Sequence, residues 1–75
     1  MAKTYKVNFT WDDEANVWIA ISNDIPLALE SDSLDTLMSR VRLAAPEIIE
    51  LNHSYVGNID FEFYVAHKER LVVGG

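Results

Sequence analysis

The N-terminal part of the chain contains two apolar runs separated by a short polar stretch. In the first run, TYKVNFTW, the apolar positions alternate with polar ones and are Tyr5, Val7, Phe9 and Trp11. A period of two residues is typical of a β-strand with one buried and one solvated face. The second run, NVWIAIS, follows so closely that the sequence predicts an antiparallel β-hairpin.

The expected register of this hairpin depends on the length of its loop. With a loop over residues 12–16, Trp11 pairs with Val17 and Phe9 pairs with Ile19, and each pair shares the buried face. The opposite face then carries Thr10, Trp18 and Ala20. The alternative is a β-bulge in the hairpin, which would return Trp18 to the core.

A turn and a third short strand are predicted after the hairpin. Asn23, Asp24 and Pro26 are turn-forming residues, and the following segment LALE is long enough for one short strand. Proline can begin such a strand, but it cannot donate a hydrogen bond from a central position.

The period of the apolar positions then changes to three and four residues, which predicts an amphipathic helix. Ser33 or Asp32 is the expected N-cap. The inward positions of this helix are Leu34, Leu37, Met38, Val41, Ala45 and Ile48. Because proline lacks an N–H group, we expect Pro46 either to kink the helix or to stop it before a second short helix.

The segment IDFEFYVAH alternates again and predicts a fourth strand. The fold class is therefore α+β with the order β-β-β-α-β, an antiparallel meander with one covering helix and a fourth strand parallel to a meander strand. We expect a single domain over residues 1–75, with one sheet face left uncovered. The tail from Leu71 to Gly75 has three alternatives: it lengthens the last strand, pairs with a neighbouring subunit, or frays.

Charge and size restrict the function. The net charge of −6, from twelve acidic residues and six Lys and Arg, has the wrong sign for binding phosphates, so no direct nucleic-acid binding is expected. A chain of 75 residues without cysteine has a small core and no disulfide, so we expect a homo-oligomer, dimeric or higher. With no signal peptide and no membrane-spanning run, we expect a cytoplasmic protein.

The three adjacent acids Asp12, Asp13 and Glu14 are the strongest catalytic candidates in the sequence. Side chains at a hairpin tip diverge into solvent, so we interpret them as a polar turn; a metal-dependent nuclease is the remote alternative. His53 and His67 lack the spacing of metal ligands. We therefore expect no catalytic residue, no metal and no cofactor.

The uncovered sheet face is the expected binding surface. Trp18 and Tyr64 stand on it in the predicted register, and Trp and Tyr are enriched in interface hot spots. The predicted partner-binding residues are Trp18, Tyr64, Thr10 and Ala20, with Asp12, Asp13 and Glu14 beside them.

Several of these motifs together resemble the HicB-like antitoxin domains, most closely their short stand-alone members of undefined function. In those domains a strand ending in acids is followed by a strand with an aromatic residue, a D-x-P element and a D-[ST]-L-x-x-L helix start. The corresponding residues here are Trp11 to Glu14, Trp18, Asp24 with Pro26, and Asp32, Ser33 and Leu34 with Leu37. One departure is Leu27, which stands where a glycine commonly follows the proline.

The resemblance implies a partial RNase H-like fold without catalytic machinery. HicB-like domains typically neutralise HicA-type toxins, which are small, basic, RNA-cleaving proteins, and an acidic domain suits such a partner. Longer members carry a C-terminal DNA-binding module, which we do not expect here. The predicted function is a non-enzymatic protein-binding domain of antitoxin type, with a self-associating structural module as the alternative.

Overall fold

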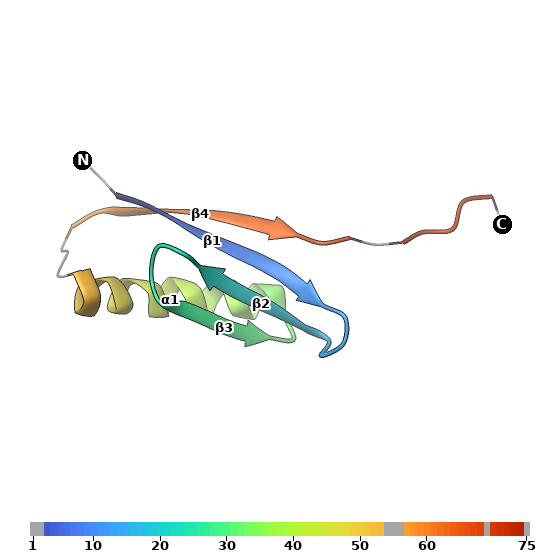
Figure 1. The fold of residues 1–75 in the computed structure, drawn as a ribbon, viewed down its shortest axis with the longest axis horizontal. Helices are drawn as coiled ribbons and strands as arrows, with labels where there is room; N and C mark the ends of the chain where they lie inside the picture. The colour runs from blue at the N-terminus through green and yellow to red at the C-terminus, as the bar shows by residue number, and fades with distance from the viewer. Residues whose placement is uncertain (1–2, 54–56, 69, 75) are drawn as a thin grey trace.

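A computed structural model describes residues 3–53, 57–68 and 70–74 as one mixed β-sheet with one α-helix (Figure 1). The elements in chain order are β1 (Lys3–Asp12), β2 (Val17–Ser22), β3 (Leu27–Ser31), α1 (Leu34–His53) and β4 (Ile59–Ala66). The α+β class and the predicted β-β-β-α-β order are confirmed. α1 is not long and apolar enough to cross a membrane.

The strands lie in the order β3-β2-β1-β4. β2 pairs antiparallel with both β1 and β3, and β4 pairs parallel with β1 on its other side. A parallel pair needs a long crossover connection, and α1 supplies it between β3 and β4. The predicted parallel pairing of the last strand with a meander strand is confirmed.

The core lies between the sheet and α1, which packs over β2 and β3. We call this side of the sheet the helix face. The core residues are Tyr5, Val7, Phe9, Ala20, Ile25, Leu27, Leu37, Val41, Ala45 and Ile49. The last of these continues the helical period one position beyond the inward residues predicted from the sequence.

Ser33, one of the two predicted caps, caps the helix. Its Oγ accepts a hydrogen bond from the backbone N–H of Thr36 at 3.3 Å, and its carbonyl oxygen accepts one from the N–H of Leu37 at 3.0 Å. α1 continues through Pro46 to His53, so the alternative in which proline stops the helix is wrong.

The β1–β2 hairpin has a shorter loop than the sequence pattern suggested. Asp12 pairs with Val17 and Trp11 pairs with Trp18, so the loop contains only residues 13–16. Asn16 donates its N–H to the carbonyl oxygen of Asp12 at 2.8 Å and has a φ of 56°. Asn is among the few non-glycine residues that adopt this left-handed conformation readily, and here it closes the loop.

The shorter loop changes which face carries each residue of β2. A shift of one residue in register turns every side chain to the other side of the sheet. Ala20 pairs with Phe9 and is fully buried, and Trp18 lies half-buried against the core. The prediction that Trp18 and Ala20 stand on the uncovered face is therefore wrong, although the cause is the loop length and not a bulge.

Side chains of the β2–β3 turn extend the connection between β1 and β2. Ser22 Oγ donates to the carbonyl oxygen of Lys6 at 2.8 Å, and Asp24 Oδ2 accepts from the N–H of Lys6 at 2.8 Å. Asp24 N–H also donates to Ser22 Oγ at 3.1 Å. Ser22 is buried, and these bonds satisfy its hydroxyl. The turn predicted at this position is confirmed, and these hydrogen bonds tie it to β1.

The conformation of Asn16 makes the hairpin register testable. Asn16→Ala should lower the free energy of unfolding by about 1 kcal/mol, because an alanine at positive φ brings its Cβ too close to the carbonyl oxygen. Asn16→Gly is the matched control and should stay within about 0.5 kcal/mol of the wild type. Urea unfolding followed by circular dichroism measures both, and an alanine variant as stable as the glycine variant would contradict the left-handed turn.

Candidate protein-binding surface

No described element covers the sheet face opposite α1, which we call the open face (Figure 1). One row of paired residues crosses this face from β3 to β4. It consists of Ala28, Ile21, Asn8 and Tyr64. Ile21 and Tyr64 each keep 46% of their surface exposed. Large apolar and aromatic side chains with this exposure form a suitable centre for a protein contact.

A second row lies one step along the strands. It consists of Glu30, Ile19, Thr10 and Ala66. The structure therefore places Thr10 and Tyr64 on the open face, as predicted, and adds Ile19 and Ile21 in place of Trp18 and Ala20. The signal that could have found them is Asn16, whose tolerance of positive φ favours a tight loop.

Carboxylates flank the apolar part of the open face. Glu30 stands on β3, Asp60 and Glu62 stand on β4, and Lys6 is the base on this face of β1. Tyr64 Oη donates a hydrogen bond to Glu62 Oε2 at 2.5 Å. The pKa of Tyr64 lies above its ordinary value of 10.0, because this bond holds the phenolic proton and the Glu62 charge repels a tyrosinate.

The three acids of the hairpin tip do not converge. Asp12 Oδ1 accepts from the backbone N–H groups of Glu14 and Ala15 at 3.0 and 3.3 Å. Asp13 Oδ1 accepts instead from Trp11 Nε1 at 2.6 Å. In the part of the chain that the structure describes, no group of three or more His, Cys, Asp or Glu side chains is placed to hold a metal ion. The tip is a hydrogen-bonded turn whose acids add negative charge beside the sheet.

Two tryptophans and a histidine form a cluster at the hairpin end of the helix face. The ring centroids of Trp11 and Trp18 are 5.6 Å apart, and that of His67 lies 5.4 Å from Trp18. Edge-to-face and tilted arrangements at these distances are favourable. The predicted register implied that Trp18 stands free on the surface, but its ring packs against two other rings. It holds His67, the first residue after β4, against the sheet.

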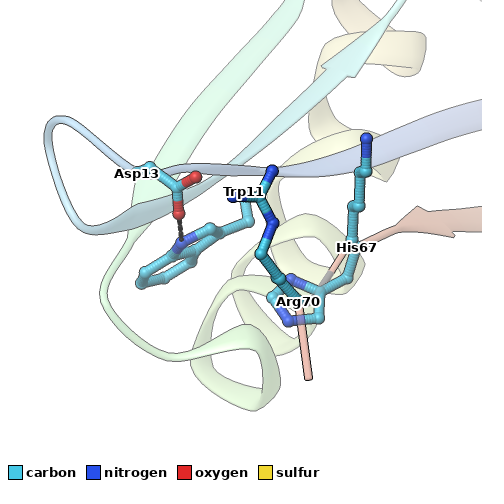
Figure 2. Close-up of a pocket in the computed structure, with 5 residues that line it drawn as sticks. Trp11, Asp13, His67 and Arg70 are labelled. Atoms are coloured by element: carbon cyan, nitrogen blue, oxygen red, sulfur yellow. Dashed lines mark hydrogen bonds between the residues drawn. The ribbon is translucent and has the colours of Figure 1, made fainter. Parts of the chain in front are cut away.

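A shallow pocket of about 650 Å³ opens beside this cluster (Figure 2). Its lining residues are Trp11, Asp13, His67, Lys68 and Arg70. Figure 2 shows the Trp11–Asp13 hydrogen bond at the pocket, with His67 and Arg70 among the other side chains that line it. The pocket brings the acidic hairpin tip next to the basic segment that follows β4.

The model of one protein family, the Domain of unknown function DUF1902, matches residues 4–74. The chain belongs to the DUF1902 family. It is also similar to a solved crystal structure of a hypothetical protein from the extremely thermophilic bacterium Thermus thermophilus. The identity is 31%, the match covers 92% of this chain and 100% of that one, and the TM-score is 0.77. None of the curated proteins matches the sequence.

The DUF1902 match includes both the hairpin and the segment after β4. It therefore spans the open face, the aromatic cluster and the exposed residues Leu71, Val72 and Val73. All of these parts of the molecule therefore lie within the DUF1902 domain.

The packing of Trp18 on the helix face gives a prediction about stability. Trp18→Ala should lower the free energy of unfolding by about 2 kcal/mol, because the side chain packs on the core and on two neighbouring rings. Tyr64→Ala on the open face is the control and should change it by about 0.5 kcal/mol or less. Urea unfolding measures both, and equal effects of the two changes would contradict the packing of Trp18.

The hydrogen bond between Tyr64 and Glu62 gives a prediction about titration. Glu62→Gln should lower the pKa of Tyr64 towards its ordinary value, because the variant loses the negative charge that disfavours the tyrosinate. The ultraviolet absorbance of tyrosinate measures this change, and Tyr64→Phe in both backgrounds identifies the step that belongs to Tyr64. An unchanged titration of Tyr64 in the Gln variant would contradict the interaction.

Proposed function

We propose that this DUF1902 domain is a non-enzymatic protein-binding domain of HicB-like type that binds a small basic protein through its open face. The observation that carries the proposal is the combination of half-exposed Ile21 and Tyr64 with flanking carboxylates on a sheet face that α1 does not cover. An apolar centre with a charged rim is the usual composition of a protein interface.

The charge of the domain supports a basic partner. The chain carries a net charge of −6, and the acids of the open face and the hairpin tip contribute to this excess. Opposite potentials speed the encounter of two proteins, whereas burial of aromatic and aliphatic side chains holds the complex together. The open face offers both contributions.

The resemblance to HicB-like domains suggests the class of partner. HicA-type toxins are small, basic and RNA-cleaving, and antitoxins of the HicB-like type act by covering the toxin surface. We propose that this domain acts in the same way, without catalysis, metal or cofactor. It would neutralise its partner by occupying the basic surface that the toxin uses to bind RNA.

The test begins with a small basic protein encoded next to the gene for this domain. The two proteins are co-expressed and purified together, and the RNA cleavage by the partner is measured with and without the domain. The proposal expects a stable complex and loss of cleavage. Absence of a complex, or cleavage that the bound domain does not reduce, would remove the antitoxin function.

Two variants with the same change of charge identify the surface. Ile21→Arg places a base at the centre of the open face and should weaken the complex by roughly tenfold or more. Leu43→Arg places the same base on α1, where the native leucine is 75% exposed, and should leave the affinity unchanged. Isothermal titration calorimetry measures both variants; equal losses would contradict binding through the open face.

A further inference from the structure

β4 is an edge strand whose helix-face side chains are incompletely covered. It pairs with β1 on one side, and no described strand pairs with its other side. α1 packs over β2 and β3, so Phe61 and Phe63 are only half-buried and Val65 is 47% exposed. An edge of this kind has unpaired N–H and C=O groups next to exposed apolar surface, which is a template for another strand.

The chain after β4 carries an apolar run that no described element covers. β4 ends at Ala66, and the tail extends away from the sheet beyond the end of that strand (Figure 1). Leu71, Val72 and Val73 are 78%, 85% and 94% exposed. Exposed aliphatic residues in a contiguous run indicate a contact with another surface.

Charges along β4 and the tail are arranged with opposite signs at the two ends. The even-numbered positions carry acids at the start, Asp60 and Glu62, and bases at the end, Lys68 and Arg70. The odd-numbered positions carry apolar residues in β4, Ile59, Phe61, Phe63 and Val65, and in the tail, Leu71 and Val73, with His67 and Glu69 between them. Such a strand is complementary to a second copy of itself when the two run antiparallel.

We propose that two copies of this domain associate through antiparallel pairing of the β4 edge of each copy with the tail of the other copy, which is added to the sheet as a further strand. In this register Phe61 stands opposite Leu71 and Glu62 stands opposite Arg70, with the twofold axis at Ala66. Directly opposed residues share a face. Leu71 therefore covers the half-buried Phe61 on the helix face, and Arg70 meets Glu62 on the open face.

Two other arrangements are worse for Leu71 and Glu62. A slip of one residue would place Leu71 opposite an acid, and a parallel pairing would place Glu62 opposite the same residue of the second copy. Like charges directly opposite each other are destabilising in a sheet. The charge pattern and the apolar pattern thus both favour this pairing over a one-residue slip and over a parallel arrangement.

The structure also supplies a fixed starting point for the tail. The ring of His67 lies 5.4 Å from that of Trp18, which anchors the first residue after β4 at the end of the sheet. Lys68 and Arg70 line the pocket beside Asp13, but no hydrogen bond or ion pair ties either base to another described residue. Both bases can therefore turn to the acids of a second copy when the tail becomes a strand.

The experiment measures self-association of the full chain by analytical ultracentrifugation. The wild type should be a dimer, and Glu62→Arg and Arg70→Glu should each weaken the dimer about tenfold or more, because each places like charges opposite each other twice. An equimolar mixture of the two variants should form a heterodimer that is tighter than the homodimer of either variant. In one of its two contacts the opposite charges are exchanged between positions 62 and 70, and in the other contact Glu62 still meets Arg70.

Two further variants complete the design. Leu71→Glu should weaken the dimer, whereas Leu51→Glu on α1, where leucine is 83% exposed, should not. A monomeric wild type would overturn the proposal, as would two weak single variants whose mixture does not form a heterodimer. The proposal is independent of the proposed function, and Ile21→Arg separates them, since it should weaken binding of the basic protein and leave the dimer intact.

Discussion

Asn16 donates its backbone N–H to the carbonyl oxygen of Asp12 and, with a φ of 56°, closes the β1–β2 hairpin over residues 13–16. The Oδ1 atom of Asp12 reinforces the same turn through two further backbone N–H groups. This loop sets the register of β2 on β1, and because β3 pairs with β2, it also sets the face of every side chain in β3. The division of the molecule into a core side and an open side depends on it.

The register directs Trp18 and Ala20 of β2 to the helix face, and Ile19 and Ile21 to the open face. Ala20 is small and lies under α1, where its size allows close packing of helix on sheet, and Trp18 completes the ring cluster at the end of the core. Ile19 and Ile21 are directed to the open face, where no described element covers them. The exposed aliphatic residues of this small acidic domain are thus a product of its folding pattern, and the proposed binding to another protein would give them a use.

A single helix cannot cover a sheet of this width. α1 packs over β2 and β3, which leaves β4 as a partly covered edge and the apolar tail beyond it exposed in one copy of the chain. The open face and the β4 edge are separate surfaces with different chemistry. The open face has an apolar centre with an acidic rim, which we propose for a basic partner, and the β4 edge has the strand that we propose for pairing with a second copy. The DUF1902 match includes both surfaces.

The sequence by itself determined the elements and their order, because periods of two and three to four residues depend only on which positions are apolar. It also limited the helix cap to Asp32 or Ser33 and indicated the turn at Asp24, since both features rest on local hydrogen bonds. The face of Trp18 was decided only by the tertiary structure. The segment VWIAI is apolar at every position, so its pattern fits either face, and a difference of one residue in the loop reverses the choice. The tertiary structure also decided the position of α1 over β2 and β3, and with it the exposure of β4. Both depend on packing between elements, which a local sequence pattern does not predict.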